Sequence, residues 1–211
     1  MKIIECPRDA MQGMEEFIPT EKKAIYINQL LKVGFDTIDF GSFVSPKAIP
    51  QLRDTAEVLK QLDLTNTKSK LLAIVANTRG AEEASHFGEI NYLGFPLSIS
   101  ETFQKRNTNK TIAEALQTVE EINNTCINSG QTLVTYISMG FGNPYGDPYD
   151  LDVVGKFVSI LDKMGVRVIS LADTVGVSIP DQIKSLFTIL IKQYPLIEFG
   201  APSQMLACAG I

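Results

Sequence analysis

The chain has 211 residues, of which 45% are hydrophobic and 20% charged, a composition that excludes disordered and collagen-like classes. The net charge is -5 and lysines and arginines form no cluster, so a nucleic-acid surface is not expected. No apolar run approaches the roughly 18 residues of a membrane span, and the first residues lack a signal-peptide core. We therefore expect a cytoplasmic protein with a single domain over residues 1–211, acting without nucleic acid or membrane.

Short β-branched segments alternate with helical patterns along the chain, which is typical of a parallel sheet buried on both faces. This pattern predicts six strands and the start of a seventh. They are Lys2 to Cys6, Thr37 to Phe43, Lys70 to Ala76, Ile90 to Ser98, Thr132 to Met139, Arg167 to Asp173 and Ile197 to Ala201.

Helices between these strands are recognised by their start and stop signals. One is expected to begin with Thr20 as its N-cap and to stop at Gly34. Another has Thr111 and Glu114 at capping-box spacing and Gly130 at its end. Two further helices are expected within residues 150–165 and 179–195. Each helix returns the chain for the next parallel strand.

Such a repeat forms either an open doubly wound sheet or a closed (β/α) barrel. In both folds the chemistry lies beyond the carboxyl ends of the strands. Neither a dinucleotide-binding glycine motif nor a phosphate-binding P-loop occurs there, which weakens a nucleotide-binding interpretation. The single histidine, His86, is interpreted as a surface or packing residue. The three cysteines have no metal-ligand or disulfide spacing and are expected to be reduced thiols: Cys6, Cys126 and Cys208.

Polar side chains recur at the ends of the predicted strands. They are Arg8, Asp9 and Gln12 after the first strand, Asp39, Ser42 and Lys47 on and after the second, Ser100, Glu101, Lys105 and Arg106 after the fourth, Tyr136 and Ser138 on the fifth, and Asp173 and Thr174 after the sixth. Each of these alone is compatible with a surface charge or a strand terminus. Three acids and one arginine brought to one edge would suit a hard divalent ion, Mg²⁺ or Mn²⁺.

In such a site, Arg8 would stabilise a developing enolate or carboxylate oxygen, and Asp173 would exchange a proton with a substrate hydroxyl. This combination suits cleavage of a carbon–carbon bond next to a carbonyl group.

At these residues the chain closely resembles the hydroxymethylglutaryl-CoA lyase family. The matching stretches are "PRDAMQ", "SFVSPKAIPQ", "SETFQKRN", "YISMGFGNPYGD" and "SLADTVGV", in order and with natural spacing. "ADTVG" is shared more widely, with isopropylmalate and homocitrate synthases. The resemblance implies an α/β fold of the (β/α)8 TIM-barrel type, incomplete here, with about six βα units and the start of strand seven.

The resemblance also implies roles for individual residues. Asp9 would bind the divalent metal and Arg8 would stabilise the enolate of the departing acetyl-CoA. Asp173 would take part in proton transfer, while Asp39 stands where the family usually has glutamate and Ala10 where it has glycine. The positions implied for substrate binding are Gln12, Ser42, Ser138 and Thr174. The family reaction splits 3-hydroxy-3-methylglutaryl-CoA, an acyl-CoA substrate, into acetyl-CoA and acetoacetate.

The chain departs from the family pattern near its end. Pro202 and Gln204 stand where the resemblance places a metal-binding His-x-His pair. We therefore expect a truncated chain with little or no lyase activity unaided, and a partial barrel that is unstable, remains open or associates as a homo-oligomer. A related acyl-CoA lyase or synthase with another substrate, and a non-catalytic paralogue acting as an assembly subunit, are the alternatives.

Overall fold

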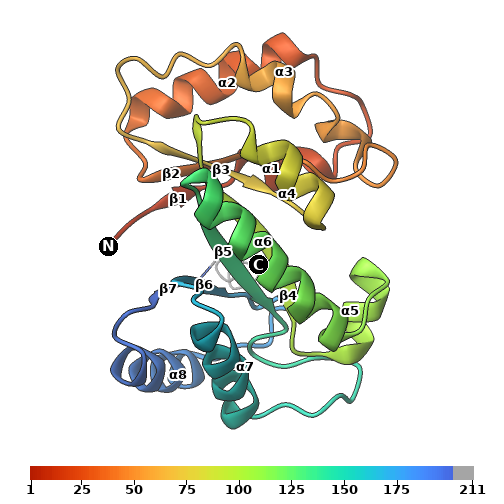
Figure 1. Cartoon of the computed structure of the whole chain (residues 1–211), viewed down its shortest axis with the longest axis vertical. Coiled ribbons are helices and arrows are strands. Elements are labelled where there is room, and N and C mark those ends of the chain that lie inside the picture. The colour runs from red at the N-terminus through yellow and green to blue at the C-terminus, as the bar shows by residue number, and fades with distance from the viewer. Residues whose placement is uncertain (202–211) are drawn as a thin grey trace. The chain divides into compact units, whose positions relative to one another are not determined.

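The computed structural model of the protein describes residues 1–201, which form two compact units (Figure 1). The first unit comprises residues 1–94 and 125–131, and the second comprises residues 95–124 and the described chain from residue 132. Strand β4 (Ile90–Ser98) and helix α6 (Ile112–Ser129) contribute residues to both units.

The strands follow one another in the sheet in the order of the chain, and the pairs run parallel. In the first unit β1 pairs with β2, β2 with β3 and β3 with β4, whereas in the second unit β5 pairs with β6 and β6 with β7. Besides β4, the strands are β1 (Ile4–Glu5), β2 (Thr37–Ser42), β3 (Lys70–Ile74), β5 (Thr132–Ser138), β6 (Val168–Leu171) and β7 (Glu198–Gly200).

Helices connect the consecutive parallel strands. Besides α6, they are α1 (Pro7–Gln12), α2 (Thr20–Val33), the 3-10 helix η1 (Pro50–Leu52), α3 (Thr55–Leu59), α4 (Thr78–Ser85), α5 (Glu101–Thr108), α7 (Leu151–Lys163) and α8 (Pro180–Gln193). Residues 1–201 thus supply six βα units and a seventh strand, the repeat of a (β/α)8 barrel. The predicted fold class is confirmed.

Each unit buries apolar side chains between its strands and helices. In the first unit, Ile27 of α2 packs in the core with Ile38 and Phe40 of β2, and all six residues of β2 are buried. In the second unit, Val154 and Val158 of α7 are fully buried. On a strand that is buried along its whole length, a charged side chain is stable only where a partner of opposite charge lies beside it.

The helix-end predictions are largely confirmed. Gly34 ends α2 in the left-handed region at φ 90°, and Thr111 and Glu114 form the predicted capping box. Thr20 was wrongly predicted as an N-cap: the N-cap is Pro19, without a side-chain bond. The Thr20 hydroxyl donates instead to Asp54 Oδ2 at 2.7 Å.

Four helices, α1, α3, α4 and α5, were not predicted as helices with bounds of their own. The segment of α1 was interpreted as a loop, but it is helical, and the segment after the fourth strand forms α5. Each spans at most eight residues, too few for apolar periodicity to stand out. Within residues 1–201, no helix combines the length and apolar character that crossing a membrane requires.

Candidate active site

The first group of site residues is built on α1, which begins directly after β1 with Pro7 at its first turn. Arg8 reaches from α1 to Asp39, which lies in the middle of β2 and is 1% exposed. The Arg8 Nε donates to Asp39 Oδ1 and Oδ2 at 3.2 and 3.1 Å, and Nη2 donates to Oδ2 at 2.7 Å. Such a forked, charge-assisted pair fixes the plane of the guanidinium.

Burial and Arg8 shift the pKa of Asp39 in opposite directions. Burial raises the pKa of the Asp39 carboxyl, while the charge and hydrogen bonds of Arg8 oppose this rise. The carboxylate is therefore the partner that holds Arg8, and it is not a free base or metal ligand. The catalytic role predicted for Asp39 stays a prediction.

Asp9 and Gln12 complete the group on the exposed side of α1. Arg8 Nη1 donates to Asp9 Oδ1 at 3.0 Å and to Gln12 Oε1 at 2.9 Å. Gln12 Nε2 donates to Asp9 Oδ1 at 3.1 Å. The Asp9 side chain is 27% exposed, and the guanidinium links its carboxylate to that of the buried Asp39. Arg8, Asp9, Gln12 and Asp39 are thus brought together as predicted.

Only some of the side chains in this group are suitable ligands for a divalent metal ion. Asp9 offers a hard carboxylate ligand, whereas Asp39 is occupied by Arg8. In the part of the chain that the structure describes, no group of three histidine, cysteine or acidic side chains could hold a metal ion. Pro202 and Gln204, which stand where the resemblance places two histidines, lie outside the described residues.

Ser42, predicted to bind substrate, ends β2 and is buried. Its hydroxyl donates to the Ile74 carbonyl and accepts from the Val44 amide, both at 3.2 Å. The Ser42 amide donates in turn to the Thr55 hydroxyl at 3.0 Å. Ser42 therefore shapes the turn after β2.

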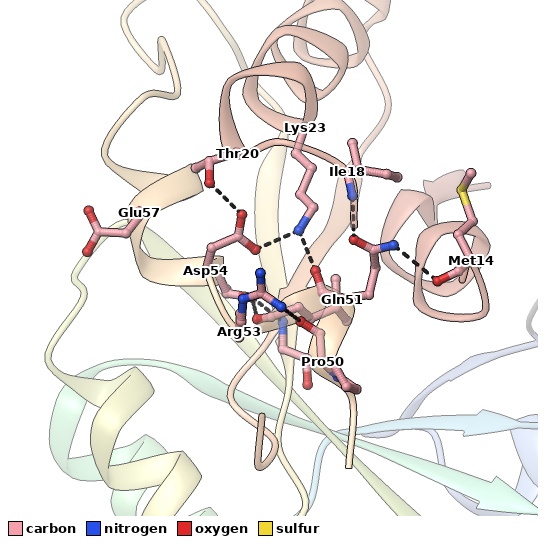
Figure 2. A network of polar contacts seen from close by, with 12 residues as sticks. Met14, Ile18, Thr20, Lys23, Pro50, Gln51, Arg53, Asp54 and Glu57 are labelled. Carbon is pink, nitrogen blue, oxygen red and sulfur yellow. Dashed lines mark hydrogen bonds and ion pairs between the residues drawn. The ribbon is translucent and has the colours of Figure 1, made fainter. Parts of the chain in front are cut away.

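A buried polar network holds the segment that follows α1 (Figure 2). Lys23 of α2 is buried, and its Nζ contacts Asp54 Oδ1 at 2.6 Å and the carbonyl oxygen of Gln51. The Gln51 amide donates to the Glu16 carbonyl at 2.7 Å, and its oxygen accepts from the Ile18 amide at 2.8 Å. These bonds fix residues 14–18. The network was not predicted from the sequence, because its bonded residues lie about 30 positions apart.

The second group of site residues belongs to the second unit and follows β6. Asp173 is 7% exposed, and its two carboxylate oxygens accept from the Val177 and Ser178 amides at 3.0 and 2.9 Å. Burial raises the pKa of Asp173, but the hydrogen bonds from residues 176–178 outweigh it and lower the pKa overall. Asp173 is therefore ionised at neutral pH.

Thr174 fixes the end of the neighbouring strand. The Met139 amide donates to the Thr174 hydroxyl at 2.8 Å, and Met139 has a φ of 60° directly after Ser138. A buried methionine in the left-handed region is strained backbone, which is concentrated at functional sites. The strained residue was not predicted from the sequence. Thr174 thus contacts Met139, the residue that directly follows Ser138 at the carboxyl end of β5.

Other predicted strand-end residues have structural partners. Ser100 caps α5, and Asp147 accepts from the Ser100 hydroxyl at 2.5 Å and from the Thr102 amide at 2.9 Å. Glu101 accepts from the Ile112 amide and pairs with Lys105. The glycine- and proline-rich loop after β5 is thereby tied to α5.

The two groups of site residues belong to different units, so the convergence of Asp9, Asp39 and Asp173 stays a prediction. Cys6 and Cys126 are free, and burial raises the pKa of both thiols to about 12. Both are therefore protonated, as the expectation of reduced thiols requires. Cys208 lies outside the described residues.

Comparisons with known proteins agree with this geometry. A family model described as HMGL-like matches residues 2–201. The hydroxymethylglutaryl-CoA lyase YngG of Bacillus subtilis is 35% identical over 90% of this chain and 62% of its own length. The mitochondrial hydroxymethylglutaryl-CoA lyase of Bos taurus is 34% identical over 93% of this chain and 60% of its own. The chain thus spans about three fifths of the length of these curated relatives.

Solved structures give the same result. The crystal structure of the Bacillus subtilis HMG-CoA lyase has a TM-score of 0.88 and 32% identity, covering 99% of this chain and 72% of that one. An HMG-CoA lyase from Acinetobacter baumannii in complex with coenzyme A and 3-methylmalate has a TM-score of 0.85 and 31% identity, covering 94% and 65%. The resemblance predicted from the motifs is confirmed.

Proposed function

The chain belongs to the HMGL-like family, and from this membership we propose that it acts as a carbon–carbon lyase on an acyl-CoA ester. The proposed substrate is 3-hydroxy-3-methylglutaryl-CoA, because the relatives that match most of the chain carry the name of that lyase. The coenzyme A in the Acinetobacter baumannii complex supports an acyl-CoA substrate.

The proposed reaction is a retro-Claisen cleavage. A base removes the proton of the tertiary hydroxyl group, and the bond between C2 and C3 breaks as the new carbonyl forms. The electron pair passes to the thioester, which leaves as an enolate and is protonated at C2. The products are acetoacetate and acetyl-CoA, and no redox cofactor is consumed.

The Arg8–Asp39 pair is the observation that carries this proposal. Asp39 holds the guanidinium through Nε and Nη2, so the positive charge is fixed before an oxyanion develops. A preorganised charge stabilises an enolate oxygen without reorganisation during the reaction. We assign enolate stabilisation to Arg8, with Asp39 as its positioning residue.

In the second unit, Asp173 is the carboxylate that we propose for proton transfer. Its lowered pKa keeps it ionised, and its backbone hydrogen bonds fix its oxygens. Thr174 and Ser138 are proposed to contact substrate beside it, and Gln12 and Ser42 to do so in the first unit.

We propose that the protein requires Mg²⁺ or Mn²⁺. Among residues 1–201, Asp9 is the carboxylate that we propose as a ligand of this ion. When bound, such an ion supplies Lewis-acid charge stabilisation. Removal of divalent ions with a chelator should lower the rate, and replacement of Asp9 by asparagine should lower metal affinity. A cytoplasmic location and a homo-oligomer are further proposals.

An assay of acetoacetate release tests the substrate assignment. The protein is incubated with 3-hydroxy-3-methylglutaryl-CoA and Mg²⁺ or Mn²⁺, and in parallel with other 3-hydroxyacyl-CoA esters. Release from the first substrate alone supports the proposal. Preferential cleavage of another ester identifies a related acyl-CoA lyase, and a soluble oligomer that cleaves none of them indicates an assembly subunit.

A further inference from the structure

Helix α1, which carries Arg8, is too short to hold its own position. It spans six residues, Pro7–Gln12, which is less than two turns, and no side-chain bond caps its start at Cys6. Isolated helices of this length are marginal in water, so tertiary contacts decide where they lie. The placement of the Arg8 guanidinium therefore depends on what anchors the two ends of α1.

The two ends of α1 are anchored in different ways. The start follows β1 closely, and β1 is paired with β2 in parallel register. The far end continues into residues 14–18, which belong to no helix or strand. The backbone groups of such a segment need partners outside regular secondary structure. An anchor for the far end of α1 must therefore come from another part of the chain.

Gln51 supplies this anchor through three hydrogen bonds to the segment (Figure 2). Its Nε2 donates to the carbonyl oxygens of Met14 at 3.2 Å and Glu16 at 2.7 Å. Its Oε1 accepts from the Ile18 amide at 2.8 Å. Both N–H groups and the oxygen of one buried amide are thus bonded to the backbone of this segment. The first of these partners, Met14, lies two positions after Gln12, the last residue of α1.

Gln51 is itself held in place by a buried lysine. Lys23 of α2 is 2% exposed, and its Nζ contacts the backbone carbonyl of Gln51 and Oδ1 of Asp54. The same ammonium group lies 4.2 Å from the ring centre of Phe17, within the anchored segment. A buried charge with these partners resists displacement, because losing one would leave the charge uncompensated. Lys23 therefore fixes both Gln51 and part of the segment that Gln51 anchors.

The anchored end of α1 is linked to the guanidinium by short contacts. Gln12 Oε1 accepts from Arg8 Nη1 at 2.9 Å, so the last residue of α1 contacts the same guanidinium that Asp39 holds from β2. The Met14 amide donates to the Met11 carbonyl at 3.0 Å, and Met11 is buried. A shift of Met14 would therefore move the last turn of α1 and the contacts that this turn makes with Arg8.

We propose that Gln51 is a positioning residue for Arg8: it fixes the far end of α1 and thereby holds the guanidinium where an enolate oxygen develops. This inference rests on the proposed function for the role of Arg8 in the reaction. Gln51 acts through the backbone of residues 14–18 and does not contact the substrate. Its loss should therefore slow the bond-breaking step and leave substrate affinity nearly unchanged.

Nitrogen-15 NMR of the whole chain tests the proposal without turnover. The Arg8 Nε–H is bonded to Asp39, so its exchange with solvent reports how often that pair opens. Its signal is assigned as the one that disappears in Arg8→Lys. The test variant is Gln51→Met, which has a similar shape and no amide.

Gln131→Met is the matched control. Gln131 is also buried and belongs to the same unit. Its Nε2 donates to the backbone carbonyls of residues 84, 87 and 90, none of which lies in α1. The control therefore removes the same kind of buried amide without touching the anchor of α1.

Gln51→Met should speed exchange of the Arg8 Nε–H about tenfold relative to wild type, because the pair opens more often. Gln131→Met should change this exchange by less than about twofold, although both variants lower the melting temperature. In the cleavage assay, Gln51→Met should lower kcat about tenfold and change KM by less than about twofold.

If Gln51→Met does not fold, Gln51→Glu takes its place, since it keeps the acceptor for the Ile18 amide and loses only the two donors. Exchange of the Arg8 Nε–H should again be faster than in wild type. Unchanged exchange in a folded Gln51 variant, or equal acceleration by Gln131→Met, would overturn the proposal. Faster exchange with an unchanged kcat would overturn the link to catalysis.

The outcome is separable from that of the proposed function. Faster exchange specific to the Gln51 variants, in a protein that cleaves no substrate, supports the positioning of Arg8 and contradicts the lyase. Cleavage by the wild type with Arg8 exchange insensitive to Gln51 does the reverse.

Discussion

Arg8 links the half-buried carboxylate of Asp9 to the buried carboxylate of Asp39, and its removal has consequences at both. The Arg8 side chain is 13% exposed and that of Asp39 is 1% exposed, so the pair is largely shielded from solvent. Breaking a buried pair by removing one partner leaves an uncompensated charge, which costs more than the pair itself contributes.

Arg8→Gln should therefore lower the free energy of unfolding by about 3 kcal/mol at pH 7. Without the arginine, burial raises the pKa of Asp39 further above its unfolded value. A carboxyl with a raised folded pKa regains stability as the pH falls, because the folded state takes up the proton first. Urea unfolding at pH 7 and at pH 4 should thus show a smaller loss at pH 4.

The double variant Arg8→Gln/Asp39→Asn provides the control for this pair. It leaves no buried charge, so its loss at pH 7 should be smaller than the sum of the two single losses. Additive losses without pH dependence would contradict the pairing.

For Asp173 we expect the opposite pH dependence of the free energy of unfolding. Its folded pKa is lowered, so its stabilisation is fully present above the unfolded pKa of about 4 and disappears as the pH falls through the folded value. Asp173→Asn should cost about 1 kcal/mol at pH 7, and the difference from wild type should shrink below pH 4. Unfolding curves over this pH range check it, with the exposed Glu120→Gln as control. A difference that stays constant with pH would refute the role of the carboxylate.

At the scale of elements, α4 is held close to the turn after β2 by the absence of a side chain at Gly80. Intrinsic propensity alone would make alanine stabilising by up to about 1 kcal/mol in a helix. Because the new Cβ meets the Phe43 carbonyl, Gly80→Ala should instead cost about 1–3 kcal/mol.

Gly155→Ala in α7 is the matched control, since nothing lies within 4 Å of a Cβ at that helical position. Thermal unfolding of both variants distinguishes the two effects. An increase in the melting temperature of Gly80→Ala would show that α4 does not approach the turn as described.

The elements that the sequence predicts well are those with long, regular patterns. The strands and the helices α2, α6, α7 and α8 follow from alternating apolar segments and from signals such as Gly34 and the Thr111 capping box. The short α1 was missed because six residues make less than two turns. A proline at the first helical position, Pro7, was a signal that could have identified it.

At the scale of the whole molecule, the family and the residue types of the site followed from motifs, whereas their partners did not. Arg8 and Asp39 lie 31 positions apart, and their contact depends on the parallel register that pairs Glu5 with Ile38. Lys23 finds Asp54 by the same kind of long-range packing. Partners set by register and packing leave no local pattern in a single sequence.

A single-turnover assay with protein in excess over 3-hydroxy-3-methylglutaryl-CoA tests whether this chain cleaves that ester with Arg8 as the group that stabilises the enolate. With Mg²⁺ or Mn²⁺ present, we expect acetyl-CoA and acetoacetate in equal amounts from the wild-type chain. We expect loss of both products in Arg8→Gln that remains folded by circular dichroism. Equal product formation by wild type and Arg8→Gln would contradict the role of Arg8, and no product from wild type would contradict lyase activity in this chain and favour the non-catalytic alternative.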